Sequence, residues 1–366
     1  MSALLIVGHG TRDEDGAAEF RSFVRRVERR AFERGAADAV AGGFIELSPP
    51  PLKDAVAGLV DAGHRDLTAV PLILLAAGHA KGDIPAALAR ERDRHPGLRT
   101  KYARPLGPHP VVLELLRRRL AECVAGLEEG ADASSHARPD AVLLVGRGTT
   151  DPDANADLYR AARLLWETAG DTGIRQVEAA FVSLAEPSVA QGLDRLRALG
   201  ARRVVVLPFF LFPGVLPIRI HAQVGEWLDG HPDSLSAVVA GVIGDCDELA
   251  DLVLERYAEA DGRGAAPVGM NCDACVYRIA LPGFEARVGQ EQHPHDHPDD
   301  PAHAHGYGYG HSHDHGHHHE VGHGHDHGHA RPHDAAHSHS PDQREVRSVP
   351  ETRVSSPAGP PPASVG

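Results

Sequence analysis

Short apolar runs alternate with longer amphipathic segments along about the first 260 residues of the chain. The apolar runs predict strands at 3–7, 39–47, 66–75, 99–104, 141–146, 175–183, 202–212 and 235–242. Apolar residues at helical spacing predict helices at 17–34, 51–62, 84–95, 109–125, 153–170, 187–199, 217–230 and 246–260. Strands and helices in strict turn are typical of α/β folds, with parallel sheets covered by helices on both faces.

Three stretches of the first half return in the second half, in the same order. LLIVGHGTRD at 4–13 matches LLVGRGTTD at 143–151, GGFIELSPPPL at 42–52 matches AAFVSLAEPSV at 179–189, and GHRDLTAVPLILL at 63–75 matches GARRVVVLPFFLF at 200–212. The shared offset of 137 or 138 residues predicts two homologous domains, at 1–125 and 140–262, joined by a linker at 126–139. Two such three-layer domains placed face to face form a cleft at the carboxyl ends of their strands, where open α/β sheets bind ligands.

The composition changes after about residue 262. The segment 263–290 contains an MxCxxC motif, and 291–366 holds mostly His, Asp, Gly, Pro and Ser. Such a tail cannot offset the entropy of ordering and is expected to be disordered. Of the 26 histidines, 18 lie between 293 and 339, a density that binds divalent cobalt, nickel or zinc without a fixed fold. A low-complexity expansion without a selected role is the other interpretation.

Charge and composition exclude several classes of function. The net charge of −14 gives no basic surface for nucleic acid or for an anionic membrane. No run approaches the roughly 18 apolar residues of a membrane span. Four cysteines in 366 residues do not make a disulfide scaffold. The first residues do not resemble a signal peptide, so a cytoplasmic location is expected.

Three polar residues end the first three predicted strands. His9 lies between two glycines after the first strand, Glu46 ends the second, and His79 follows the third. Taken singly, the first histidine could equally be structural, and the glutamate a solvated or capping residue. Together they form a nitrogen–oxygen ligand set that suits a transition metal such as cobalt, iron or nickel. The three are therefore the candidate catalytic and metal-binding residues.

The second half provides an internal control, because it lacks these ligands. At the equivalent positions it has Arg147, Ser183 and the segment PGVLPIRI at 213–220. Residues that carry the fold are shared between the halves and the ligands are not, so we interpret the ligands as functional and the first half alone as carrying the chemistry. Arg147 and Arg219 would then face the site from the other domain, where guanidinium groups pair with carboxylates.

Two other motifs bear on chemistry. Asp83 is interpreted as the N-terminal cap of the third helix, with a catalytic role as the alternative. Cys272 and Cys275 form a CxxC pair, which binds soft metals or an iron–sulfur cluster, or acts as a dithiol. Cys123 and Cys246 are interpreted as buried single cysteines, so a four-thiolate cluster needs a second chain or other ligands.

The motifs VGHGT, FIE followed by prolines, and GHAKGDIP occur together in this chain. In combination they resemble the class II chelatases, in particular the long, two-domain sirohydrochlorin cobaltochelatases of the anaerobic cobalamin route. The second-half segments GRGTTDPDANADLYRAARLLWE, FVSLAEPSVAQGL and VVVLPFFLFPGVLPIRI are similar to the same subfamily. Its long members carry a histidine-rich stretch and an MxCxxC motif, matched here by Met270, Cys272 and Cys275. The resemblance covers about residues 1–290, and the tail here is longer and further toward the C-terminus.

This resemblance implies a lyase that inserts a divalent metal, cobalt in preference to iron or nickel, into sirohydrochlorin in cobalamin biosynthesis. It implies two parallel α/β domains facing each other across a tetrapyrrole cleft. It places the metal on His9 and His79, gives Glu46 an assisting role, and associates Cys272 and Cys275 with an iron–sulfur cluster. Sirohydrochlorin and the metal ion are the expected partners, with a homodimer left open.

A mechanism follows as a hypothesis. Sirohydrochlorin must lose two pyrrole protons as the ion enters, so the reaction needs a proton acceptor beside an exchangeable metal site. The two histidines would hold the ion or take a proton, and the glutamate would balance charge and carry protons away. Arg12, Arg147 and Arg219 are the candidate donors to the substrate's acidic side chains. The alternatives are an iron-inserting chelatase that makes sirohaem, and a non-enzymatic metal chaperone or store.

Overall fold

The computed structural model describes residues 2–129, 138–169, 173–232, 234–264 and 286. The predictions for the MxCxxC segment and for the histidine-rich tail fall outside these residues. Among the described helices, none combines the length and the hydropathy that crossing a bilayer requires.

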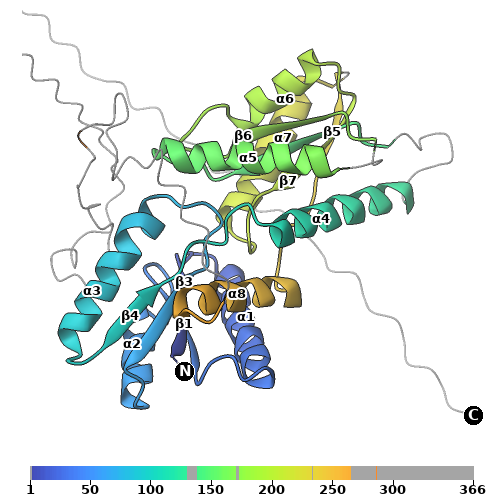
Figure 1. The fold of residues 1–366 in the computed structure, drawn as a ribbon. Coiled ribbons are helices and arrows are strands. Elements are labelled where there is room, and N and C mark those ends of the chain that lie inside the picture. The colour runs from blue at the N-terminus through green and yellow to red at the C-terminus, as the bar shows by residue number, and fades with distance from the viewer. Residues whose placement is uncertain (1, 130–137, 170–172, 233, 265–285, 287–366) are drawn as a thin grey trace, which may run out of the picture. The chain divides into compact units, whose positions relative to one another are not determined.

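Two parallel four-stranded sheets form the framework (Figure 1). The first has the order β2 (Val40–Phe44), β1 (Ala3–Gly8), β3 (Asp66–Pro71) and β4 (Arg99–Tyr102). The second repeats that order with β6 (Gln176–Phe181), β5 (Ala141–Gly146), β7 (Arg203–Pro208) and β8 (Ser236–Val239). The predicted pair of homologous parallel α/β units is thereby confirmed.

Helices connect the strands as the sequence pattern predicts. They are α1 (Glu14–Glu33), α2 (Leu52–Asp61), α3 (Ile84–Arg94), α4 (Pro110–Glu129), α5 (Pro152–Thr168), α6 (Val189–Ala198), α7 (Val215–Gly230) and α8 (Asp247–Asp261). Local signals fix several of their ends. The side chain of Asp13 accepts a hydrogen bond from the backbone N–H of Gly16 at the start of α1, and Ser188 and Gln191 form a capping box at the start of α6. A π-helical turn, η1 (His79–Asp83), precedes α3 and was not predicted.

The central strands are buried on both faces, and alternate residues enter different cores. Leu4 and Ile6 of β1 pack into one hydrophobic cluster, while Leu5 and Val7 pack into a second that α2 and α3 cover. The first of these clusters also contains Leu144 of β5. One continuous apolar core therefore runs through both halves, with a separate outer core behind each sheet.

Each half contributes its last helix to the other half. Figure 1 shows α8 beside α1 and the first sheet, and it packs there against α1, β3 and β4. In return, α4 packs against α5 and β7 of the second half. Tyr257 of α8 is fully buried, and its hydroxyl donates a hydrogen bond to the backbone carbonyl of Ser2. The covering layer of each sheet is thus completed by the opposite half of the chain.

Buried charge joins the two halves as well. Lys81 of η1 donates to Asp151 at 2.8 Å and to Asp153 at 2.9 Å, both at the start of α5. The side chains of Lys81 and Asp151 are only 6% and 1% exposed. Burial lowers the pKa of Lys81, but the hydrogen bonds that its ammonium group donates to the two carboxylates outweigh that effect and raise the pKa above its ordinary value. The ammonium group therefore stays charged and paired at neutral pH.

We expect Lys81→Met to lower the free energy of unfolding by about 3 kcal/mol, because it leaves buried carboxylates without their cation. Urea unfolding followed by circular dichroism measures this change. Arg99→Met is the matched control, since Arg99 pairs with Asp66 on the surface with its own side chain 75% exposed. That variant should unfold almost as the parent does. Equal losses in the two variants would contradict a special role for the buried pair.

Candidate metal centre

Sheet topology brings His9, Glu46 and His79 together. His9 directly follows β1, Glu46 follows β2, and His79 opens η1 after β3. Because β1 lies between β2 and β3 in a parallel sheet, the three carboxyl ends meet at one edge. The backbone fixes this further, since the N–H of Glu46 donates to the carbonyl of His9 at 3.1 Å.

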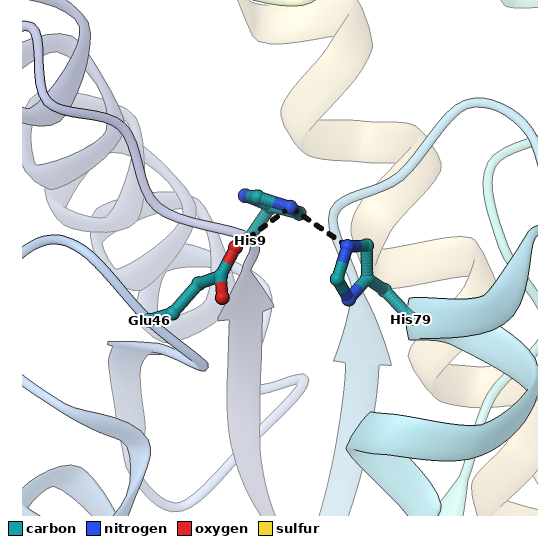
Figure 2. Close-up of side chains that lie close together, drawn as sticks. All are labelled: His9, Glu46 and His79. Atoms are coloured by element: carbon teal, nitrogen blue, oxygen red, sulfur yellow. Dashed lines mark hydrogen bonds and ion pairs between the residues drawn. The ribbon is translucent and has the colours of Figure 1, made fainter. Parts of the chain in front are cut away.

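The ligand atoms of the three side chains converge on one point (Figure 2). Nε2 of His9 lies 2.9 Å from Nε2 of His79 and 3.1 Å from Oε1 of Glu46. One ligand atom from each residue lies within 4.8 Å of the other two. The imidazole rings stand nearly perpendicular, at 88°, with centroids 4.2 Å apart. In the described part of the chain, this is the group of His, Cys, Asp or Glu residues whose geometry could hold a metal ion.

Hydrogen bonds at Nδ1 assign the tautomers of both imidazoles. Nδ1 of His9 lies 2.9 Å from the carbonyl oxygen of Gly10, which can only accept, so this nitrogen carries the proton. Nδ1 of His79 lies 2.6 Å from Oδ2 of Asp83 and donates in the same way. A ring that is neutral therefore keeps its lone pair on Nε2. The two Nε2 atoms lie 2.9 Å apart, a distance that requires a proton or a metal cation between or beside them.

Electrostatics keep the first imidazole neutral. Burial, with further contributions from the neighbouring His79 and Arg147, lowers the pKa of His9 to about 3. Nε2 of His9 is therefore unprotonated at neutral pH. Glu46, which is buried, supplies the nearby negative charge. A divalent cation fits this arrangement, because both imidazoles can bind it through Nε2 and the carboxylate of Glu46 can pair with its charge.

Asp83 orients His79 instead of capping α3. The predicted cap is wrong, because Asp83 has helical φ and ψ of −66° and −45° and makes no side-chain cap bond. The π-helical turn runs without a break into α3, so no free N–H groups are left at that point for Asp83 to cap. With the residue 2% exposed, its carboxylate instead accepts the Nδ1 proton of His79.

The second half places a cation at the equivalent edge. Arg147 follows β5, as His9 follows β1, and its Nη1 lies 3.2 Å from Nε2 of His9. Guanidinium only donates, which agrees with the lone pair assigned to that nitrogen. Ser183, at the place of Glu46, donates from its hydroxyl to the carbonyl of Arg147 at 3.1 Å. Arg12 and Arg219 are exposed, and their part in binding stays a prediction.

The predicted cysteine sites have different standings. Cys123 and Cys246 are free thiols and only half-buried, and burial raises the pKa of both above the ordinary value. At neutral pH they are therefore protonated and poor metal ligands. Cys272 and Cys275 lie outside the described residues, so their part in a cluster stays a prediction.

Comparisons with known proteins match both halves of the chain. The CbiX family model matches residues 3–123 and again 141–260. A sirohydrochlorin cobaltochelatase of Priestia megaterium is 36% identical over 282 residues, which cover 77% of this chain and 86% of that protein. A sirohydrochlorin ferrochelatase of the same organism is 28% identical and covers 69% and 88%.

A solved structure supports the same relationship. The sirohydrochlorin chelatase SirB from Bacillus subtilis subspecies spizizenii, in complex with cobalt, is 26% identical with a TM-score of 0.57. The similarity covers 72% of this chain and 97% of that one. The two family matches contain the two parallel sheets, and the candidate metal centre lies within the first of them. This chain belongs to the CbiX family and contains the family's domain twice.

Proposed function

We propose that this protein is a sirohydrochlorin chelatase, a lyase that inserts a divalent metal ion, cobalt above iron, into the tetrapyrrole. The observation that carries the proposal is the pair of facing Nε2 atoms, 2.9 Å apart, with a buried carboxylate beside them. Such a site binds a dication through few protein ligands and leaves coordination positions open for an incoming macrocycle. The cobaltochelatase and ferrochelatase relatives support the choice of substrate.

The reaction needs both a metal site and a proton acceptor. As the ion leaves His9 and His79 for the four nitrogens of the macrocycle, two N–H protons must depart. We propose that Glu46 accepts the two protons one after the other and passes each to bulk water, because its carboxylate lies 3.1 Å from Nε2 of His9 and is buried. Asp83 holds the Nδ1 proton of His79, which keeps Nε2 free for the ion throughout. No nucleotide or redox partner enters this scheme.

Arg147 has two proposed effects. Its fixed positive charge beside Nε2 of His9 repels a bound dication, which keeps the metal exchangeable. The same guanidinium can pair with a carboxylate of the acidic tetrapyrrole. Pairing would neutralise the repulsion as the macrocycle arrives, so substrate binding and metal position are coupled through one side chain.

Cobalt is the metal we favour, with iron as the alternative. Two nitrogens and one oxygen do not by themselves distinguish the two ions. The Priestia megaterium cobaltochelatase is 36% identical to this chain, against 28% for the ferrochelatase of that organism, which favours cobalt. A cytoplasmic location, a homodimer, a cluster at Cys272 and Cys275, and metal storage by the tail stay proposals from the sequence.

A metallation assay tests the proposal. The purified protein should accelerate the spectral change of sirohydrochlorin with Co²⁺, and more with Co²⁺ than with Fe²⁺ under anaerobic conditions. His79→Ala should reduce the rate on the order of 100-fold or more, since it removes a ligand. His64→Ala is the control, because His64 lies in the turn before β3, at the other end of the strands. No acceleration with either metal would refute the chelatase proposal.

The neutral state of His9 predicts a pH dependence of stability in the metal-free protein. Its pKa is about 3 when folded and near 6.5 when unfolded, so between these values only the unfolded chain takes up the proton. The stabilisation is complete above 6.5 and is lost as pH falls toward 3. Thermal unfolding with chelator present, at about pH 7.5 and about pH 4.5, should show a larger loss for the parent than for His9→Gln. Parallel losses would mean that His9 is protonated in the folded state.

Replacing Arg147 by Gln should separate metal binding from substrate binding. We expect the metal-free protein to bind Co²⁺ roughly tenfold more tightly, because a unit charge a few ångström from a dication costs about 1 kcal/mol or more. Affinity for sirohydrochlorin should fall in the same variant. Calorimetry with Co²⁺ and fluorescence titration with the tetrapyrrole measure the two. Arg195→Gln, an exposed change on α6, should alter neither; unchanged Co²⁺ affinity in Arg147→Gln would refute the repulsion.

A further inference from the structure

Two leucines have a backbone conformation that leucine normally avoids. Leu47 has a φ of 63° and Leu184 a φ of 62°, and in the described part of the chain they are the non-glycine residues with positive φ. In each case the N–H of the following residue donates to the carbonyl of the preceding one, from Ser48 to Glu46 at 2.7 Å and from Ala185 to Ser183 at 2.8 Å. This is the strained, positive-φ form of the γ-turn.

The strained leucines contribute little to the core. Leu47 is 45% exposed and Leu184 is 63% exposed. Burial of these side chains therefore stabilises the fold too little to offset the strain of the backbone. Glycine would fit both turns with less strain. Their two positions are equivalent in the duplicated halves, and both halves present leucine there. The exposed isobutyl group, held outward by the turn, is therefore the feature that requires an explanation.

The backbone before each γ-turn packs closely against the glycine that follows His9 or Arg147. A Cβ on Gly10 would lie 1.8 Å from the carbonyl oxygen of Glu46, and one on Gly148 would lie 1.9 Å from that of Ser183. These glycines directly follow His9 and Arg147, whose side chains meet at 3.2 Å. Leu47 directly follows Glu46, and Leu184 directly follows Ser183. Each leucine is therefore next to a residue whose carbonyl packs against the loop of His9 or of Arg147.

The start of α7 adds a third apolar element to this region. Val215 and Ile218 are exposed there, in the second-half segment that is equivalent to the loop carrying His79 in the first half. The preceding Gly214 is close to the hydroxyl of Thr11, since a Cβ on it would lie 3.6 Å from that oxygen. The N–H of Thr11 in turn donates to the hydroxyl of Ser48, next to Leu47, at 3.0 Å. The α7 residues therefore belong to the same neighbourhood as the first γ-turn.

We infer that Leu47, Leu184, Val215 and Ile218 form an apolar platform that holds the flat ring system of the tetrapyrrole over the metal centre. The inference rests on the proposed function, and it concerns recognition of the conjugated macrocycle, as opposed to its carboxylates. A macrocycle that receives the ion must lie directly over the Nε2 atoms, and the apolar side chains nearest to them are those its faces and edges meet. Of the eight large apolar residues that are exposed in the described part of the chain, these four lie on the two γ-turns and at the start of α7, the segments that adjoin the loops of His9 and Arg147.

The γ-turns allow a test that separates binding from folding. In the full-length protein, Leu184→Gly should weaken sirohydrochlorin binding about 10-fold, the loss expected for one apolar side chain that the ligand covers. The melting temperature should stay the same or rise, because glycine accepts positive φ without strain. The affinity of the tetrapyrrole-free protein for Co²⁺ should not change. Ile218→Ser should likewise weaken sirohydrochlorin binding and leave Co²⁺ binding intact.

Leu199→Ser is the matched control, because Leu199 is an equally exposed leucine at the end of α6, ahead of β7. It should leave both affinities unchanged. Wild-type affinity for sirohydrochlorin in Leu184→Gly and Ile218→Ser would overturn the platform while the chelatase proposal stands. A lower melting temperature in Leu184→Gly would also overturn it, because the leucine would then serve the fold. Failure of the parent protein to metallate sirohydrochlorin would overturn the proposed function, and the platform with it.

Discussion

The chemistry of this protein depends on a hydrogen-bonding constraint at two imidazoles. Nδ1 of His9 faces the carbonyl of Gly10 and Nδ1 of His79 faces the carboxylate of Asp83. Both Nδ1 protons are therefore used in hydrogen bonds that point away from the candidate metal centre. The two Nε2 atoms then face each other, and burial keeps that of His9 unprotonated at neutral pH. This nitrogen is therefore available to the metal ion that we propose for the site. The roles that we propose for the carboxylate of Glu46 and the guanidinium of Arg147 both depend on a metal ion bound at these imidazoles.

The two halves share one scaffold but present different functional residues on it. The strand order is identical in both sheets, and the loops after equivalent strands have the same backbone hydrogen bonds. On that shared frame the first copy has His9 and Glu46 where the second has Arg147 and Ser183. One copy therefore supplies the imidazoles and negative charge, and the other supplies positive charge and three of the four exposed apolar side chains of the platform. A metal ion and a macrocycle with acidic side chains on a flat ring system require both kinds of surface.

The sequence predicted the strands and helices well because the central strands are apolar on both faces, a pattern that few other folds produce. The meeting of His9, Glu46 and His79 was also predictable, since each ends a strand and the strands are parallel. Asp83 was misassigned because an acidic residue before Ile-Pro has the usual signature of a helix cap, and nothing local distinguishes a π-helical turn. The strained turns at Leu47 and Leu184 were missed, although the leucine repeated at offset 137 was visible.

The exchange of final helices was not predictable from periodicity, because an apolar stripe does not specify which sheet it will cover. It has an evolutionary consequence. The inner face of α8 must fit side chains of α1 and β3, which the opposite half encodes, and α4 is bound to α5 and β7 in the same way. A change of volume on either surface is therefore tolerated only with compensation in the other copy. The loops at the metal edge were free to diverge after duplication, while the exchanged helices obliged the two copies to keep evolving together.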